Sequence, residues 1–190
     1  MNNSQPKVRL RLLSREDMAR IFLWKTDRQV LHFLGRDPDM PRSQEKFVER
    51  FQRRLLSPRA RRLIQGIEAP GGELIGYVSI SNIDLYRKIG KFSILIGNRA
   101  YWDRGLGTAA ARLFLRRIFG ETTLKYLFLY TAHFNARAQR CFEKCGFRVV
   151  WDYVPAKDAS AYESIKMMLT REMFLRSEAL WRERMADPER

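Results

Sequence analysis

The segment from Ile94 to Ala110 constrains the fold more than any other part of the sequence. Its apolar start leads into a loop that holds Gly105 and Gly107, and an apolar helical pattern then runs to about Phe119. The N-terminus of a helix attracts anions because its first N–H groups have no partner within the helix and its dipole is positive there. Glycines allow a phosphate to approach the main chain closely because they have no Cβ. We therefore expect a strand–loop–helix unit that binds an anion.

The spacing of this loop excludes two common nucleotide sites. A P-loop requires Lys after its last glycine, but Thr108 follows Gly107 here. A dinucleotide-binding loop requires a third glycine, where Ala110 stands, and an acidic residue about twenty positions on, whereas residues 125–129 include none. Arg104 and Thr108 add a cation and a hydroxyl to the same turn, so anion binding by another kind of loop is expected.

Periodicity places this unit within an alternation of strands and helices. Ser14, Ser43 and Thr170 each precede a helical pattern as a capping residue. Strand–helix–strand order occurs only in the second half of the chain, so we expect a mixed sheet. The strand expected at 124–131 is nearly apolar throughout, which predicts a central position with both faces covered. Expected strands span 8–13, 62–69, 73–83, 89–97, 124–131, 147–153 and 162–169, and expected helices span 14–25, 27–34, 43–56, 107–119, 135–145 and 170–185.

Composition narrows the class of protein. Hydrophobic residues make up 45% of the 190 residues, which suits one domain over residues 1–190 with a substantial core. No apolar run approaches the ~18 residues that cross a bilayer, so no membrane span is expected. Arg9 and Arg11 interrupt the short apolar stretch near the N-terminus, so no signal peptide is expected. With only Cys141 and Cys145, a disulfide framework is excluded and a cytoplasmic location is expected. His32 and His133 do not complete a zinc spacing with them, so we expect no metal.

The chain is strongly basic, with 36 Lys and Arg against 21 Asp and Glu and a formal net charge of +15. Such a charge attracts phosphates and RNA and repels polycations, although it also serves solubility alone. Arginines gather between Arg50 and Arg62 without an acidic residue among them, a cluster suited to RNA phosphates. The charge therefore favours an anionic or RNA-associated partner and argues against a polyamine or aminoglycoside acceptor.

A second segment, downstream of the glycine loop, has the pattern of a well-formed short helix. Asn135 follows an apolar strand and is a good N-cap. Ala138, Phe142 and Cys145 lie on one helical face. Gly146 ends the helix before the next strand. On local grounds alone, this pattern indicates only a helix that packs by one face.

Together the two segments resemble the GNAT N-acetyltransferase superfamily, whose members transfer an acyl group from acyl-CoA. The first family motif, Arg/Gln-x-x-Gly-x-Gly/Ala, is matched by Gly105 and Gly107, with Trp102 in the Arg/Gln position. The second motif, N-x-x-A followed by an aromatic residue and G-F, is matched at every spacing between Asn135 and Phe147. The segments VRLRLLSREDM, ELIGYVSISNID and AYWDRGLGTAA are similar to the RimJ/RimL-type branch, which acetylates protein N-terminal amines.

The resemblance implies the GNAT fold and a CoA site. The fold is a mixed α/β, mostly antiparallel sheet, flanked by helices and splayed between the strands at 89–97 and 124–131. Its motif core spans about 73–155, and an extra C-terminal helix spans about 170–186. The loop amides would hold the CoA pyrophosphate, while the end of the strand before the loop and the N-cap asparagine would contact pantetheine. The implied CoA-binding residues are Leu95, Ile96, Gly97, Arg104, Gly105, Leu106, Gly107, Thr108, Asn135 and Phe142.

The catalytic groups are less well defined than the CoA site. Phe142 stands where many family members have a Tyr whose hydroxyl protonates the departing CoA thiolate. A thiol with a pKa near ~8.5 leaves partly unprotonated, so this loss slows the step without preventing it. Candidates for the base that deprotonates the acceptor amine are His133, Tyr130 and Glu163, with Asp84 as a weaker alternative. His133 equally fits a half-buried histidine bonded to the main chain.

The implied activity is acetyl-CoA-dependent N-acetylation of a primary amine, above all a protein N-terminal α-amine of a ribosomal protein or an RNA-associated assembly. Two alternatives remain open: an acetyltransferase for a small-molecule amine, and a non-catalytic acyl-CoA- or RNA-binding module, which the missing Tyr favours. The expected partners are acetyl-CoA and the amine acceptor, without a membrane. Apolar residues of the last helix either pack in the core or form a dimer face, so a monomer and a homodimer both remain open; they are Phe174, Leu175, Leu180 and Trp181.

Overall fold

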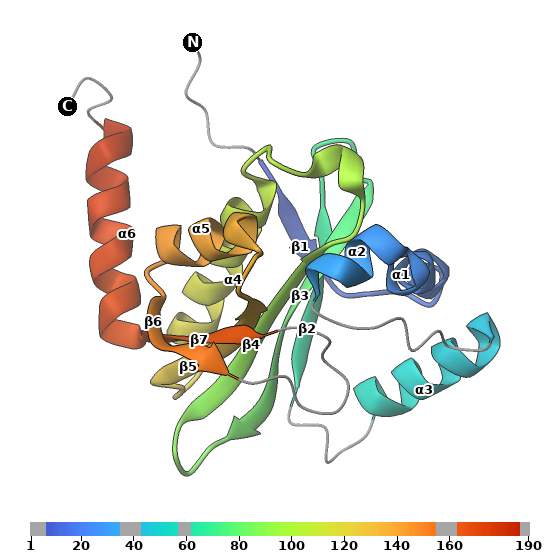
Figure 1. Ribbon diagram of the computed structural model, residues 1–190, viewed down its shortest axis with the longest axis horizontal. Helices are drawn as coiled ribbons and strands as arrows, with labels where there is room; N and C mark the ends of the chain where they lie inside the picture. The colour runs from blue at the N-terminus through green and yellow to red at the C-terminus, as the bar shows by residue number, and fades with distance from the viewer. Residues whose placement is uncertain (1–6, 35–42, 57–61, 155–162, 187–190) are drawn as a thin grey trace.

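The computed structural model describes residues 7–34, 43–56, 62–154 and 163–186, which form one seven-stranded sheet with helices on both faces (Figure 1). The strands are β1 (Arg9–Arg11), β2 (Leu63–Glu68), β3 (Leu74–Asp84), β4 (Ile89–Ile96), β5 (Tyr126–Ala132), β6 (Arg148–Val154) and β7 (Ser164–Thr170). They lie in the order β1-β2-β3-β4-β5-β7-β6. Neighbours are antiparallel except β4 and β5, which are parallel, so the predicted mixed sheet is confirmed.

The helices begin close to where the capping residues predict. Side-chain oxygens of Ser43 and Thr170 accept hydrogen bonds from N–H groups three residues on, at 3.2 and 3.0 Å. The first helix begins at Asp17, three residues after Ser14, and the Asp17 carboxylate accepts the Ser14 N–H at 2.7 Å, which is one half of a capping box. The helices are α1 (Asp17–Thr26), α2 (Arg28–Phe33), α3 (Gln44–Leu56), α4 (Leu106–Glu121), α5 (Ala136–Lys144) and α6 (Arg171–Ala186), with a 3₁₀ turn at Arg99–Tyr101.

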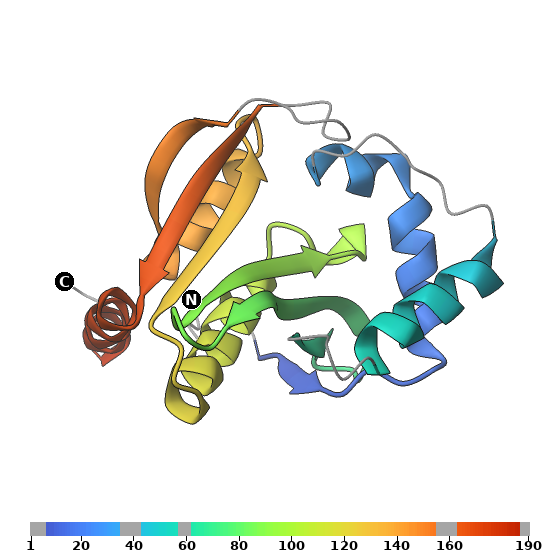
Figure 2. The same cartoon turned by 90° about the horizontal axis from the view of Figure 1, so that it is seen from below.

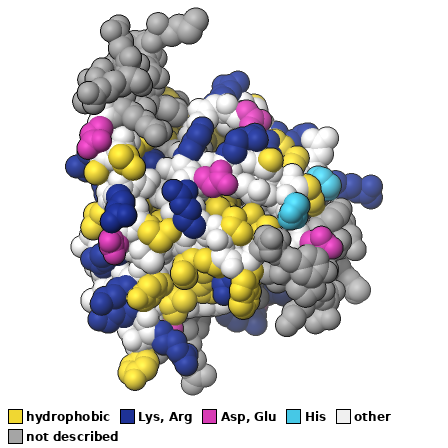
Figure 3. All heavy atoms as spheres, turned by 60° about the vertical axis from the view of Figure 1, so that its left-hand side comes forward, with side chains coloured by type: hydrophobic (Ala, Val, Ile, Leu, Met, Phe, Trp, Pro, Cys, Tyr) yellow, Lys and Arg dark blue, Asp and Glu magenta, His cyan; other side chains and the backbone are white. Residues whose placement is uncertain are grey.

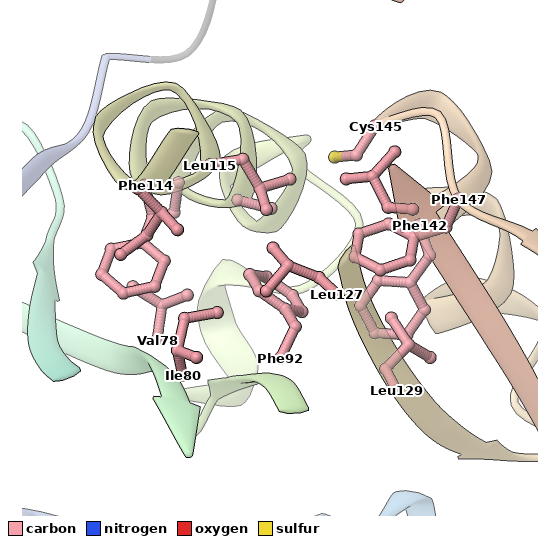
Figure 4. Packing of buried hydrophobic residues seen from close by; sticks show 14 of the residues in the cluster. Val78, Ile80, Phe92, Phe114, Leu115, Leu127, Leu129, Phe142, Cys145 and Phe147 are labelled. Carbon is pink, nitrogen blue, oxygen red and sulfur yellow. The ribbon is translucent and has the colours of Figure 1, made fainter. Parts of the chain in front are cut away.

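Two apolar clusters hold the layers together. The larger lies between the sheet and α4, α5 and α6, and its aromatic centre is Phe92, Phe114 and Phe147 (Figure 4). The smaller lies on the opposite face, where Trp24 of α1 packs with Leu95 of β4. Both clusters take side chains from β3, which is buried throughout its first seven residues.

The strand covered on both faces is therefore β3 and not β5. Leu127 and Leu129 of β5 are buried in the larger cluster, whereas Tyr126 and Tyr130 on the other face are 42% and 41% exposed. β5 has the predicted central position, but its predicted double burial is wrong. The reason is that the smaller cluster draws its strand residues from β2, β3 and β4, so the half of the sheet beyond β4 has one open face.

The last helix is fastened through a buried ion pair that the sequence pattern does not predict. Arg112 of α4 and Glu178 of α6 are 2% and 5% exposed, with 2.8 Å between Nη2 and the carboxylate. Arg112 also donates to the main-chain oxygen of Lys144 at the end of α5, so it joins three helices. Of the apolar residues predicted for the core, Phe174 is buried, Trp181 is half-buried, and Leu175 and Leu180 are exposed.

Two further expectations concern partners. In the described ranges, no helix is both long and apolar enough to cross a bilayer. Basic and apolar side chains are interspersed over the face drawn in Figure 3, with fewer acidic ones. Of the arginine cluster, residues 57–61 lie outside the described residues, and Arg53 forms an ion pair with Glu49 at 2.8 Å. An RNA contact of this cluster stays a prediction.

Candidate active site

The parallel strands β4 and β5 pair over only three residues and then diverge. The pairs join Ile89–Lys91 to Tyr126–Phe128, and beyond them β4 pairs with β3 and β5 pairs with β7. Figure 2 shows the two strands separating, and we call this divergence the fork. The predicted splay of the sheet is thus confirmed. It leaves main-chain groups of β4 without a neighbouring strand, so an extended ligand can occupy the gap.

Alternation along β4 decides which main-chain groups face the gap. The N–H of Gly97 donates to the oxygen of Ile75 on the β3 side, at 2.8 Å. Because N–H and C=O groups of successive strand residues point to opposite edges, those of Ile94 and Ile96 face the fork. The indole Nε1 of Trp102 donates to the Ile96 oxygen at 2.7 Å, so this side chain fastens the glycine loop to the end of β4.

A cavity of about 330 Å³ opens at the fork between α2, the end of β4, the glycine loop and α5. All of the predicted CoA-binding residues line it except Gly97 and Arg104. A Cβ on Gly97 would overlap the indole ring of Trp24, so this glycine is required by packing within the protein. Arg104 is exposed, with its guanidinium over the ring of Tyr101 at 5.6 Å. The residues brought together are Leu95, Ile96, Gly105, Leu106, Gly107, Thr108, Asn135 and Phe142.

The two loop glycines serve different purposes. Gly105 caps α4 with φ +72°, a left-handed conformation that favours glycine. Gly107 lies inside the helix, and a Cβ there would meet Ile96 at 3.5 Å and Cys141 at 3.9 Å, which are ordinary contacts. No packing of the described chain therefore requires glycine at 107. Its bare main chain borders the cavity, beside the N–H groups that begin α4, as an anion site requires.

Three cationic residues of α5 line the same cavity, and the sequence reasoning did not identify them. Arg137, Arg140 and Lys144 recur at spacings of three and four, the signal of one helix face. The guanidinium of Arg137 lies 3.8 Å from the ring centre of Trp102. Asp103 is the one carboxylate among the described residues of the lining, and it lies 3.4 Å from Arg137. The cavity is therefore positively charged and suits an anionic ligand.

Asn135 has partners within the protein. Its Oδ1 accepts the N–H of Ala138 at 3.1 Å, as an N-cap does, and its Nδ2 donates to the oxygen of Phe33 at 2.8 Å. The second contact ties the start of α5 to the end of α2 and so fixes the width of the cavity. Each amide nitrogen has two hydrogens, so one remains for the predicted contact to pantetheine.

Phe142 and Cys141 are neighbouring residues of the cavity wall. Phe142 is buried, and its ring meets Phe92 edge-on with 6.1 Å between centres, so the site offers no hydroxyl at this position. A hydrogen bond from Cys145 lowers the pKa of the Cys141 thiol, with Thr108 and Lys144 acting in the same direction. The pKa of Cys145 is raised, because it donates this bond and is buried. Among the residues described, no cluster of His, Cys, Asp or Glu could hold a metal ion.

The predicted catalytic residues do not line the cavity. The N–H of His133 donates to the oxygen of Glu163 at 3.0 Å, which brings these two residues together at the end of the β5–β7 ladder, with both side chains exposed. Tyr130 lies on the open face of β5. Asp84 lies at the closed end of the sheet, where the N–H of Arg87 lowers its pKa. Catalytic roles for His133, Tyr130 and Glu163 stay predictions.

Comparison with known proteins agrees with this geometry. The family model described as an acetyltransferase (GNAT) domain matches residues 7–148. An aminoglycoside N(6')-acetyltransferase type 1 of Klebsiella pneumoniae is 23% identical over 190 residues, which cover 95% of this chain and 91% of the relative. A spermidine N(1)-acetyltransferase of Escherichia coli K12 is 28% identical over 149 residues, 77% of this chain and 75% of the relative.

Solved structures show the same fold. The spermidine N-acetyltransferase of Vibrio cholerae, in complex with CoA and spermine, superposes with a TM-score of 0.78 at 21% identity and covers 91% of this chain and 99% of its own. A structure of that enzyme described as dodecameric has a TM-score of 0.72 at 20% identity, with 91% and 98% covered.

These relatives correct one expectation and confirm another. Their names state small-molecule acceptors, so they do not support the RimJ/RimL-type branch, whose members acetylate protein N-termini. They do support an enzyme rather than a binding module on the same fold. The motifs, the splayed sheet and the family match lead to one conclusion: the chain belongs to the GNAT acetyltransferase family, as an N-acetyltransferase that uses acetyl-CoA.

Proposed function

We propose that this protein transfers the acetyl group of acetyl-CoA directly to the primary amine of a small molecule. The observation that carries this proposal is the bare main chain at Gly107, which borders a basic cavity at the fork although no packing of the described chain requires glycine there. The curated relatives, named for aminoglycosides and spermidine, favour a small-molecule acceptor over a protein N-terminus.

The cavity residues divide into a phosphate part and a pantetheine part. N–H groups of Leu106, Gly107 and Thr108 at the start of α4 would bind the pyrophosphate, with the α5 cations beside them. The main-chain groups of Ile94 and Ile96 that face the fork would pair with the pantetheine amides, as an added strand does. The positive charge of the first part suits a pyrophosphate, and the exposed main chain of the second suits an extended amide-bearing arm.

Bound acetyl-CoA supplies an acetyl thioester, which is activated for attack by a neutral amine. The chain contributes mainly by placing the two reactants, because correct orientation supplies a large part of the barrier reduction in such transfers. The apolar ring of Phe142 in the cavity wall, packed against Phe92 behind it, would help to exclude water from the thioester. A carbonyl oxygen placed at the fork is within reach of β4 N–H groups, which stabilise developing negative charge.

The test measures binding and turnover separately. Isothermal titration of the full chain with CoA should give a dissociation constant in the micromolar range. Thiol release from acetyl-CoA should rise with a small-molecule amine. No binding at millimolar CoA would remove the proposal, and binding without turnover on a broad amine panel would favour a non-catalytic module. Turnover limited to peptides with a free α-amine would restore the protein N-terminus as the acceptor.

A further inference from the structure

Two lysines and three aromatic residues form a patch on the open face of β4, β5, β6 and β7. The strand register places Tyr130 of β5 and Trp151 of β6 on either side of Lys166 of β7. The Lys166 ammonium lies 4.7 Å from the ring centre of Trp151 and 6.0 Å from that of Tyr130. Lys91 of β4 lies 5.2 Å from the ring of Tyr130, and Phe128 completes the group. We call these five residues the lysine–aromatic patch.

This patch lies at the fork, on the face of the sheet that α4 and α5 do not cover. Lys91 and Phe128 are the last paired residues before β4 and β5 separate. The next residue on β4, Phe92, points to the other face, where its ring meets Phe142 in the cavity wall. Ile94, which lines the cavity, lies three positions along β4 from Lys91 of the patch. Because α4 and α5 cover the other face of the sheet, the face of the patch is the one open to an acceptor at this point of the fork.

The charges of the patch disfavour a cationic acceptor. A cationic amine gains most from aromatic rings when it lies over their faces, but here lysine ammoniums already occupy the faces of Tyr130 and Trp151. Among the described side chains, no carboxylate forms an ion pair with Lys166, and the exposed Glu163, which directly precedes β7, is three residues away in the sequence. A second cation would therefore meet repulsion, whereas an anion would meet an ammonium held in place by two rings.

From this arrangement we infer that the acceptor is an amine that also carries an anionic group, a carboxylate or a phosphate, which binds the Lys166 ammonium between Tyr130 and Trp151. The inference rests on the proposed function and specifies its acceptor class. It distinguishes this chain from relatives named for spermidine and aminoglycosides. A net charge of +15 over the whole chain adds long-range attraction for such an acceptor.

The experiment compares matched acceptors on the full chain by thiol release from acetyl-CoA. Butylamine is paired with 4-aminobutyrate, and glucosamine with glucosamine 6-phosphate, so the two arms separate a carboxylate from a phosphate. Spermidine and kanamycin represent polycations. We expect kcat/KM at least tenfold higher for the anionic member of one pair, since a hydrogen bond between charged groups contributes about that factor. The preference should weaken at high salt.

Substitutions at Lys166 then test the site itself. Lys166→Gln should remove most of the tenfold preference through KM, and Lys166→Glu should reverse it, while titration with CoA gives an unchanged dissociation constant. Lys125→Gln, at an exposed lysine that precedes β5, is the matched control and should retain the preference. Preference retained in Lys166→Glu would overturn the inference. So would equal or better turnover of spermidine or kanamycin, which leaves the proposed function intact. CoA binding without turnover of any amine would contradict both this inference and the proposed function.

Discussion

The two sides of the fork are built in different ways. The CoA side takes most of its residues from one stretch of chain, 94–144, with α2 completing the cavity wall, and its central feature is main chain that begins a helix. The acceptor side takes Lys91, Tyr130, Trp151 and Lys166 from four strands, and only the register between them brings the side chains together. A site made of main chain depends on where side chains are missing, whereas a site made of side chains depends on which ones are present.

This difference has a consequence for change in sequence. On the CoA side, most substitutions of exposed side chains leave the N–H groups in place, and only a new side chain at a bare position blocks them. On the acceptor side, a single substitution alters charge or shape directly at the ligand. Relatives with the same fold and different named acceptors are expected from such an arrangement.

The largest effect is expected from a side chain at Gly107. Gly107→Leu fills the space beside the helix N-terminus where the pyrophosphate would lie, and it displaces several charge-assisted hydrogen bonds. Each such bond contributes about 1.5–3 kcal/mol, so we expect CoA to bind at least about 100-fold more weakly by isothermal titration. The fold should persist, because a Cβ at 107 makes only ordinary contacts.

Gly120→Leu is the matched control on the same helix. Gly120 lies near the other end of α4, where a Cβ would meet no atom within 4 Å. This variant should bind CoA as the parent chain does, and thermal unfolding should show both variants folded. Equal CoA affinity in Gly107→Leu and the parent chain would mean that the pyrophosphate lies elsewhere, and the contrast between the two sides of the fork would be lost.

A smaller effect is expected from the α5 cations. Arg140→Gln combined with Lys144→Gln removes two charges from the cavity lining but leaves the helix N-terminus intact. Exposed charges interact through water, so we expect about a tenfold loss of CoA affinity that shrinks further at high salt. Arg148→Gln, at an exposed arginine of β6 beyond the cavity, should change affinity little. If CoA affinity fell further than in Gly107→Leu, the side-chain charges would contribute more to CoA binding than the main chain does.

Local signals explain why the CoA side was predictable from the sequence. Gly105, Gly107 and Asn135 lie at helix starts, and each has a role that neighbouring residues determine, whether a left-handed turn, a bare main chain or a cap. Gly97 shows the limit of such reasoning. It belongs to the same segment, but a side chain is excluded there because it would overlap Trp24, which is far away in the sequence.

The acceptor side could not be derived in the same way. An alternating pattern shows that Tyr130 and Lys166 face away from the core, but it does not show that they face each other. The nearly apolar strand β5 also misled, because aromatic residues at 126, 128 and 130 are apolar in composition yet lie on the open face. The buried ion pair of Arg112 and Glu178 was not predicted for a related reason, since charged residues in a helix normally indicate its solvent-exposed face.

Alkylation of Cys141 tests the wall of the CoA cavity. Because its pKa is lowered by the hydrogen bond from Cys145, the thiolate forms at a lower pH than in an ordinary thiol, near ~8.5. The rate of iodoacetamide labelling, followed by mass spectrometry, should therefore rise at a lower pH than labelling of the same thiol in the unfolded chain. Saturating CoA should slow it at least about fivefold, because Cys141 lines the cavity. Cys145 is fully buried with a raised pKa and should stay unlabelled; labelling unaffected by CoA would contradict the site.

The smallest effect is expected where the two sides meet. Phe142→Tyr adds a hydroxyl at the position from which other family members protonate the leaving thiolate, so kcat should rise, but only about two- to fivefold, since a CoA thiol leaves partly unprotonated. The ring is buried against Phe92, so the hydroxyl must point into the cavity to avoid an unpaired buried group. In a profile of kcat against pH, the gain over the parent chain should vanish above the pKa of the new phenol, because the ionised phenol has no proton to give. Phe147→Tyr, away from the cavity lining, should bring no gain. A fall in kcat with unchanged CoA affinity would mean that the apolar ring, by excluding water, contributes more to the transfer than a proton donor would.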